Sequence, residues 1–312
     1  MKEGNRARLV SKTLRLVTRA GLKPVFSTRL PLLVQRSVIS AASRFFPRPQ
    51  GVRDVEHYLD GVLARRLIPE GAPDGRAILY LHGGAYVLGS PGTHFGIAAR
   101  IALASGCEVF VIDYRLAPEH PAPAALDDAV SAWKALTASH GAVALAGDSA
   151  GAGLALATAV ALRDAALVAP RALALISPWV DLTLSGESMQ TLAAADPLLS
   201  RNWLAWAAAH YANGRNLDDP MLSPLFSPLA GLPPVLIHVG SDEVLLSDTQ
   251  RLETALRAAG VEVQSRVYQD LWHDFQLQAG LMPEADESLD TLGRFLRAGL
   301  EPAACAVNAK SI

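Results

Sequence analysis

Short apolar runs alternate with stretches of helical periodicity along most of the chain. Runs such as 77–81 (AILYL) and 108–114 (EVFVIDY) are typical of strands that are buried on both faces of a sheet. Further strands of this kind are predicted at 142–146, 172–177, 235–239 and 262–268. Helices are predicted between them, at 93–105, 123–139, 150–164, 247–259 and 284–299. The alternation predicts an α/β fold, with a mostly parallel sheet and helices on both of its faces.

The first 70 residues show a different pattern. Two helices are predicted there, at 5–21 and 30–45. Residues 53–60 and 62–68 then read as a hairpin, because Asp60-Gly61 between them is a strong turn signal. The sheet is therefore expected to carry antiparallel pairing at one edge.

Residues 180–225 interrupt the alternation of strands and helices. This stretch carries Trp203, Trp206, His210 and Tyr211, and a run punctuated by prolines follows them. Long insertions between strands commonly serve as lids or binding loops. The aromatic side chains also suit packing of the insertion onto the body, and the two roles are compatible.

Composition narrows the class of protein. The 312 residues are 50% hydrophobic and 19% charged, which is typical of a globular chain able to bury a large core without disulfides or metal. A net charge of −2 argues against a nucleic-acid binder. Two cysteines, Cys107 and Cys305, exclude a disulfide framework and a cysteine-rich zinc site. The sequence has no uninterrupted run of 18 apolar residues, so no membrane-spanning helix is predicted.

The charge is unevenly distributed. Residues 1–50 contain eleven lysines and arginines but a single acid, Glu3. An amphipathic basic segment can touch anionic lipid, but its apolar stripe more commonly packs on the domain. We favour packing, and expect no stable membrane insertion. Basic residues break the segment every few positions, which argues against a secretory signal and leaves a cytoplasmic location as the expectation.

The pentapeptide Gly147-Asp148-Ser149-Ala150-Gly151 is a G-x-S-x-G motif. It follows a predicted strand and precedes a predicted helix, which is the setting of a nucleophile elbow. The serine of such an elbow sits on a strained turn, and the flanking glycines keep side chains away from the crossing strand and helix. A phosphate-binding turn is the alternative, but no Walker lysine follows. Ser149 is the predicted nucleophile.

A second glycine-containing loop, His82-Gly83-Gly84-Ala85-Tyr86, directly follows the strand at 77–81. Backbone N–H groups of small residues can approach the oxyanion that forms during acyl transfer. Gly83 and Gly84 are the predicted donors, with the N–H of Ala150 as a third. His82 is expected to order the loop, and Tyr86 to line the pocket or pack in the core.

A general base needs a carboxylate to orient it. His273 follows the last predicted strand, and Asp242 follows the strand VLIHV, so both lie at the strand ends where Ser149 is expected. The order serine, acid, histidine is that of α/β-hydrolases. Asp242 is the predicted partner of His273, with Glu243 and Asp248 as rival acids.

These motifs together resemble the hormone-sensitive-lipase-like esterases, a bacterial family with an HGGG-type motif upstream of GDSAG. The resemblance spans about residues 50 to 300. It rests on HGGAY at 82–86, DYRLAPEHPAPAALDD at 113–128, GDSAG at 147–151 and the loops of Asp242 and His273. Two departures stand out: Ala85 replaces the third glycine, and the acid loop, often D-P-L-x-D in the family, reads DEVLLSD here.

The resemblance implies an α/β-hydrolase fold with an eight-stranded, mostly parallel sheet and a helical cap. The implied division is cap helices at 1–45, a catalytic core at 46–179 and 226–300, a cap insertion at 180–225 and a flexible tail at 301–312. The substrate pocket is expected to involve Tyr86, Asp148, Trp203, Trp206 and Tyr211. Plant hormone receptors of similar sequence have lost the catalytic histidine, whereas His273 is present.

The sequence therefore predicts a serine carboxylesterase that acts on short-chain esters through an acyl-enzyme and uses no cofactor or metal. A lactone hydrolase or deacetylase with the same triad is an alternative. A non-catalytic small-molecule binder on the same fold is a second, because a fold does not determine a function. The expected partner is a small ester, with no nucleic acid, and a homodimer through an exposed sheet edge is compatible with the pattern.

Overall fold

The six predicted apolar runs and the two strands of the predicted hairpin form a single sheet of eight strands in the order β1-β2-β4-β3-β5-β6-β7-β8. A computed structural model describes residues 2–302. The strands are β1 (Val52–Leu59), β2 (Val62–Pro69), β3 (Arg76–Leu81), β4 (Glu108–Ile112), β5 (Ala142–Asp148), β6 (Leu173–Ile176), β7 (Val235–Gly240) and β8 (Val263–Tyr268). The pairs from β4 to β8 are parallel. The predicted α/β fold is confirmed.

The predicted hairpin forms the antiparallel edge. β1 pairs with β2 from Val52 opposite Pro69 to Leu59 opposite Val62, and β2 pairs antiparallel with β4. Asp60 and Gly61 take positive φ angles of 48° and 81°, as a tight two-residue hairpin turn needs. The sequence signal at this turn was therefore sufficient to predict the pairing.

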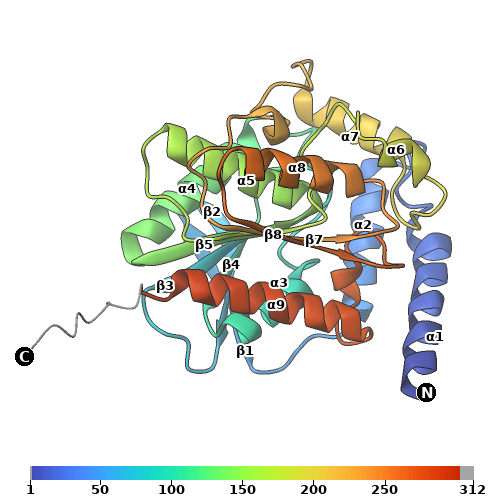
Figure 1. Cartoon of the computed structure of the whole chain (residues 1–312), viewed down its shortest axis with the longest axis horizontal. Coiled ribbons are helices and arrows are strands. Elements are labelled where there is room, and N and C mark those ends of the chain that lie inside the picture. Colours follow the sequence, from blue (N-terminus) through green and yellow to red (C-terminus); the bar gives the residue numbers. More distant parts are fainter. Residues whose placement is uncertain (1, 303–312) are drawn as a thin grey trace, which may run out of the picture.

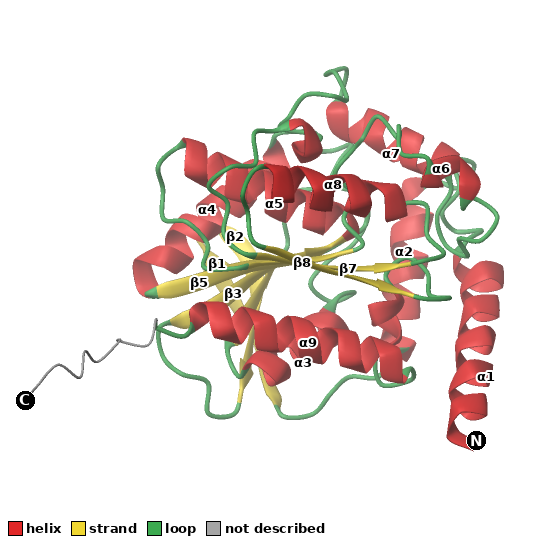
Figure 2. Ribbon diagram, viewed as in Figure 1, coloured by secondary structure: helices red, strands yellow, loops and turns green. Residues whose placement is uncertain are grey.

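Helices cover both faces of the sheet (Figures 1 and 2). One face carries α4 (Ala124–Ser139), α5 (Ser149–Asp164) and α8 (Leu246–Ala258), and the other carries α3 (Phe95–Ser105) and α9 (Pro283–Leu300). The insertion between β6 and β7 contains α6 (Ser188–Thr191), α7 (Arg201–Ala212) and η3 (Pro224–Phe226). A further short turn, η4 (Phe275–Gln278), follows β8.

The N-terminal segment consists of α1 (Lys2–Val17), η1 (Thr18–Leu22), α2 (Leu32–Ala42) and η2 (Ser43–Phe45). Figure 1 shows α1, α2 and α6 together at one end of the sheet. The tail expected at 301–312 lies outside the described residues from 303 onward. None of the helices within residues 2–302 combines the length and the apolar character that a bilayer crossing demands.

Basic side chains of this segment bind other parts of the chain. Arg19 donates to the carbonyl oxygen of Ala194 in the insertion, at 2.8 Å. Arg36 forms two hydrogen bonds of 2.7 and 2.8 Å with the carboxylate of Glu119, and also donates to the carbonyl of Val87. These contacts support the packing interpretation of the basic segment, because its cations hold the N-terminal helices against the body.

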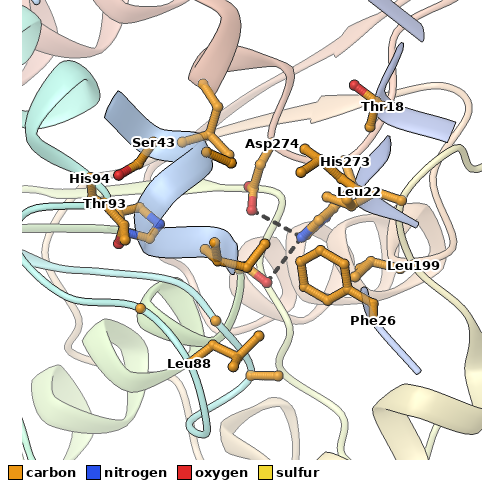
Figure 3. Close-up of a pocket in the computed structure, with 18 of the residues that line it drawn as sticks. Thr18, Leu22, Phe26, Ser43, Leu88, Thr93, His94, Leu199, His273 and Asp274 are labelled. Carbon is orange, nitrogen blue, oxygen red and sulfur yellow. Dashed lines mark hydrogen bonds and ion pairs between the residues drawn. The ribbon is translucent and has the colours of Figure 1, made fainter. Parts of the chain in front are cut away.

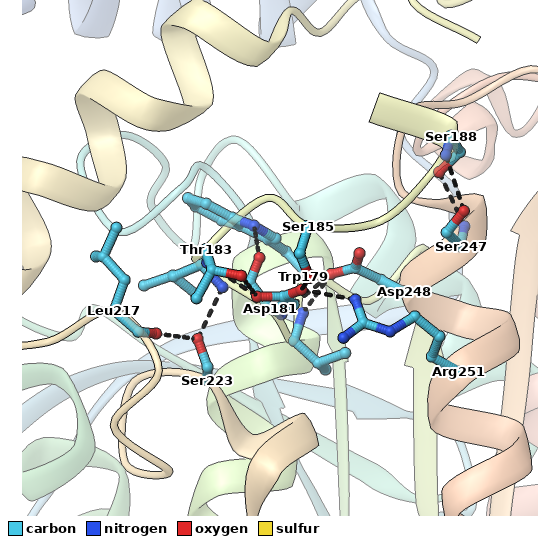
Figure 4. A network of polar contacts seen from close by, with 12 residues as sticks. Trp179, Asp181, Thr183, Ser185, Ser188, Leu217, Ser223, Ser247, Asp248 and Arg251 are labelled. Carbon is cyan, nitrogen blue, oxygen red and sulfur yellow. Dashed lines mark hydrogen bonds and ion pairs between the residues drawn. The ribbon is translucent and has the colours of Figure 1, made fainter. Parts of the chain in front are cut away.

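A buried polar network joins the insertion to α8 (Figure 4). Oδ2 of Asp248 accepts hydrogen bonds from the backbone N–H groups of Val180 (3.2 Å) and Asp181 (3.1 Å). The Asp181 carboxylate in turn pairs with Arg251 at 2.6 Å. Burial, followed by the nearby charge of Asp181, raises the pKa of Asp248 to about 8. Asp248, a rival acid in the sequence, is thus engaged in anchoring the insertion.

Candidate active site

Ser149 stands on a sharp turn between β5 and α5. Its φ of 52° is in the left-handed region, which costs a non-glycine residue about 1–3 kcal/mol. Glycines make the crossing possible: a Cβ on Gly151 would lie 2.0 Å from the carbonyl oxygen of Leu81, and one on Gly147 would lie 2.5 Å from the carbonyl oxygen of Gly151. The turn holds the serine hydroxyl at the carboxyl end of the strand.

His273, in the loop after β8, contacts this serine. Its Nε2 lies 3.0 Å from Oγ of Ser149. Its Nδ1 lies 3.2 Å from Oε1 of Glu243, so that N–H donates to the carboxylate. The second oxygen of Glu243 accepts from the N–H of Gly240 (2.9 Å) and the hydroxyl of Ser177 (2.8 Å). Serine, histidine and a fixed carboxylate therefore form one chain of hydrogen bonds.

The carboxylate in this chain is not that of Asp242. Asp242 pairs instead with Arg15 of α1 and accepts a hydrogen bond from the hydroxyl of Ser241 at 2.9 Å. Asp242 and Glu243 are consecutive in a tight turn, so their side chains leave the backbone in different directions. The prediction of Asp242 as the partner of His273 is corrected to Glu243, which the sequence had offered as a rival.

The loop after β3 presents free backbone N–H groups beside the serine. Gly84 has a φ of +118°, and a Cβ on Gly83 would lie 2.1 Å from a carboxylate oxygen of Asp148, so both positions need glycine. Within residues 2–302 no backbone acceptor is bonded to the N–H groups of Gly83 and Gly84, and Ala150 is the second residue of α5, where helix N–H groups have no intrahelical partner. The three predicted donors are available to a bound oxygen.

Two buried rings support this loop. Nδ1 of His82 lies 2.8 Å from the carbonyl oxygen of Gly83, and its ring stacks on Tyr114 with centroids 4.3 Å apart. Burial lowers the pKa of His82 to about 3, so its imidazole is neutral. Asp148 lies behind the loop, where it accepts from Tyr80 at 2.6 Å and contacts Nε2 of His94 at 3.1 Å. His82 and Asp148 thus face the loop and the core.

A cavity of about 840 Å³, including its open mouth, lies over Ser149 (Figure 3). Most of its wall is apolar and comes from the N-terminal segment and the insertion, including Leu22, Phe26, Leu199 and Trp203. The polar wall groups include Thr93, His94, His273, Asp274 and Gln278. An apolar cavity with a few convergent polar groups is typical of a small-molecule site.

Of the five residues predicted for the pocket, Trp203 alone is among those that line this cavity. Tyr86 and Tyr211 are buried and stack on each other, with ring centroids 3.8 Å apart. The ring of Trp206 packs against that of His210 at a tilt of 45°, with centroids 4.3 Å apart, and Asp148 lies behind the glycine loop. The pocket role is wrong for these four residues, because the rings pack against other aromatic side chains and Asp148 is hydrogen-bonded behind the loop. For Tyr86 the alternative expectation, packing in the core, holds.

Asp274 is a site residue that the sequence reasoning missed. Its Oδ2 lies 3.0 Å from Nε2 of His273, and it takes a left-handed φ of 52°. Burial raises the pKa of Asp274 to about 6. Burial alone would lower the pKa of His273, but the carboxylates of Asp274 and Glu243 outweigh it and hold that pKa well above its ordinary value. The only sequence signal that could have indicated Asp274 is its position directly after His273, the predicted base.

Comparison with known proteins extends these observations. The sequence profile of the α/β hydrolase fold family matches residues 78–277. The structure superimposes with a TM-score of 0.88 on an esterase from the bacterial hormone-sensitive lipase family, at 37% identity over 95% of this chain and 98% of that one. The chain belongs to this esterase family. An eight-stranded sheet in the same architecture agrees with the expectation from the motifs.

Two curated relatives are similar to this chain along most of their length. An acetyl-hydrolase of Streptomyces hygroscopicus is 43% identical over 227 residues, which is 72% of this chain and 76% of that protein. An esterase of Acinetobacter venetianus is 36% identical over 264 residues, which is 83% of this chain and 87% of that protein.

The family pattern also contains the signal that would have found Glu243. In D-P-L-x-D a leucine stands two residues after the first acid. In this chain Leu245 stands two residues after Glu243, whereas Val244 stands two residues after Asp242. Alignment on the leucine, rather than on the aspartate, places the glutamate at the acid position.

Proposed function

We propose that the chain is a serine carboxylesterase that hydrolyses short-chain esters through an acyl-enzyme intermediate. The hydrogen-bonded series from Ser149 through His273 to Glu243 carries this proposal. A serine hydroxyl is a weak nucleophile until an adjacent base removes its proton, and the base in turn needs an orienting carboxylate. A non-catalytic binder has no need of this arrangement.

In the acylation step, Oγ of Ser149 attacks the ester carbonyl while its proton passes to Nε2 of His273. Glu243 holds the proton on Nδ1 and stabilises the imidazolium that forms. The free N–H groups of Gly83, Gly84 and Ala150 bind the oxyanion, and the loss of one such donor costs about 10²–10³ in rate. The imidazolium then protonates the departing alcohol.

Deacylation repeats the sequence with water as the nucleophile. His273 takes a proton from water, hydroxide attacks the acyl carbon, and Ser149 leaves with the proton returned from Nε2. The acid product departs through the mouth of the cavity. No step requires a cofactor or a metal ion.

The helical cap is proposed to set the size of the substrate. Leu22 and Phe26 come from the N-terminal segment, and Leu199 and Trp203 from the insertion, and all four line the cavity beside the serine. The ring of Phe26 meets Trp203 edge to face, with centroids 4.7 Å apart, and so narrows the space. A confined apolar wall favours short acyl chains over long ones.

A deacetylase is the second candidate. The acetyl-hydrolase of Streptomyces hygroscopicus is 43% identical, and an acetyl group is small enough for the confined pocket proposed above. A lactone hydrolase would use the same three residues. A homodimer through an exposed sheet edge and a cytoplasmic location stay predictions.

The test is hydrolysis of p-nitrophenyl esters with acyl chains from acetyl to palmitoyl, by wild type, Ser149→Ala and His273→Ala. We expect turnover on the short esters, and its loss in both variants with unchanged thermal unfolding. Wild-type protein should also form a covalent adduct at Ser149 with an organophosphonate. Full activity of Ser149→Ala would refute the proposal. A folded wild type that reacts with neither esters nor phosphonate would favour the binder.

A further inference from the structure

The proposed mechanism makes no use of the carboxylate of Asp274, although it touches the reacting nitrogen. Its Oδ2 lies 3.0 Å from Nε2 of His273, the atom that also lies 3.0 Å from Oγ of Ser149. Figure 3 shows both contacts as dashed lines that converge on one ring nitrogen. Asp274 lines the cavity, and its other oxygen has no hydrogen-bond partner among the described residues.

Two hydrogen-bond acceptors lie this close only when a proton sits between them. Nδ1 of His273 donates its hydrogen to Glu243, so a neutral ring presents a bare lone pair at Nε2. An ionised Asp274 presents lone pairs as well, and the two would repel. One proton on Nε2 or on Oδ2 satisfies the contact. Either position occupies the lone pair that Ser149 needs as its base.

We propose that Asp274 is a positioning residue that holds one proton between its carboxylate and Nε2 of His273 in the resting enzyme. This proton must leave before Ser149 can be activated. The inference rests on the proposed esterase activity. When the pair releases the proton to solvent through the cavity, the lone pair of Nε2 is freed. The O–H bond of Ser149 can then break as a new N–H bond forms at Nε2.

The charges around the pair favour retention of the proton. The carboxylates of Glu243 and Asp148 lie on neighbouring elements, and both raise the affinity of the pair for a proton. The guanidinium of Arg15 lies 5.6 Å from the ring of Trp272, but Asp242 is its ion-pair partner. The titratable and charged groups on the packed elements are Tyr80, His82, His94, Asp148, Glu243 and Arg15.

The backbone at this position allows a clean test. The φ of Asp274 is 52°, a conformation that asparagine and glycine adopt readily. Asp274→Asn therefore removes the charge, and Asp274→Gly removes the whole side chain, without new backbone strain. Asp270 is a matched control, because it lies on the same loop with a φ of 58° and is exposed. Asp270→Asn removes a similar charge that does not touch His273.

The experiment is the pH profile of kcat/KM for p-nitrophenyl acetate with wild type, Asp274→Asn, Asp274→Gly and Asp270→Asn. In wild type, kcat/KM is expected to fall on the acidic limb with an apparent pKa above 6.5, because the Asp274–His273 pair must lose its proton before Ser149 can react. Both Asp274 variants should move that limb down by about 1–3 pH units, the usual effect of removing an adjacent opposite charge. The alkaline plateau should fall, since the imidazolium of the transition state loses a stabilising carboxylate.

The two changes have opposite signs, so the profiles of wild type and variant should cross. A merely structural disturbance would lower kcat/KM at every pH and leave the limb in place, and this result would overturn the inference. An unchanged profile would also overturn it. Asp270→Asn should keep the wild-type limb. If wild type hydrolyses no ester, the proposed function fails separately, and NMR titration of the His273 ring then decides whether Asp274→Asn lowers its apparent pKa.

Discussion

Replacement of Glu243 by glutamine tests the corrected assignment of the acid. In the wild type, one oxygen of Glu243 accepts from Nδ1–H of His273, and the other accepts from Gly240 N–H and the Ser177 hydroxyl. The amide oxygen of Glu243→Gln can keep the Gly240 and Ser177 contacts, so the fold loses little. The amide NH₂ of the new side chain then faces Nδ1 of His273, and Nδ1 must accept a hydrogen bond instead of donating one.

This change reverses the tautomer of the base. A ring that accepts at Nδ1 carries its hydrogen on Nε2, where it cannot take the proton of Ser149. Loss of the orienting carboxylate in a comparable triad lowers kcat by about 10⁴. The contact here is longer than ideal, at 3.2 Å, so we expect a loss of about 10³–10⁴ in kcat, or about 4–5 kcal/mol in the activation barrier.

Asp242→Asn is the matched control, because it removes the neighbouring carboxylate. Asp242 and Arg15 are partly exposed, with 23% and 29% of their side chains accessible, and such an ion pair contributes about 0–1 kcal/mol. We expect at most about a fivefold change in kcat/KM, and the same change in Arg15→Gln, since both loosen α1.

The assay is the initial rate of p-nitrophenyl acetate hydrolysis near pH 8, with thermal unfolding recorded for each variant. A folded Glu243→Gln with nearly normal kcat would refute the reasoning. So would a thousandfold loss in Asp242→Asn, because the acid would then be the residue that the sequence first suggested.

Three further predictions concern stability and specificity. Asp248 has a pKa raised to about 8 in the folded state, so the folded protein binds more protons than the unfolded chain between about pH 4 and 8. The protein therefore loses stability as the pH rises through that window. Asp248→Asn should flatten this pH dependence and raise the free energy of unfolding at pH 9 by about 1–3 kcal/mol, as measured by urea titration. Gly151→Ala should cost about 1–3 kcal/mol or prevent folding, because its Cβ would lie 2.0 Å from a backbone carbonyl, whereas Gly141→Ala, with nothing within 4 Å, should unfold like wild type. Phe26→Ala should widen the cavity and raise kcat/KM for hexanoyl relative to acetyl esters; an unchanged ratio would mean that the cap does not limit chain length.

The sequence by itself determined the architecture and indicated Ser149 and His273, whose side chains the fold brings into contact. Apolar runs of strand length recur between amphipathic stretches, and burial on both faces leaves a parallel sheet as the stable arrangement. The turn at Asp60-Gly61 and the G-x-S-x-G pentapeptide are local signals, because φ angles and close approaches depend on a few adjacent residues. The role of Gly83 and Gly84 as oxyanion donors stays a prediction, although their N–H groups have no backbone acceptor within residues 2–302.

Only the tertiary structure decided between neighbours in sequence. Asp242 and Glu243 stand side by side, and the direction in which each leaves the turn depends on where Arg15 and His273 lie in space. Tyr86 and Tyr211 come from distant segments, and their stacking turns both away from the cavity. Asp274 acquires its contact with Nε2 through a left-handed backbone that a linear pattern does not display. Side-chain direction at a site is set by packing among remote segments, which hydrophobic periodicity does not encode.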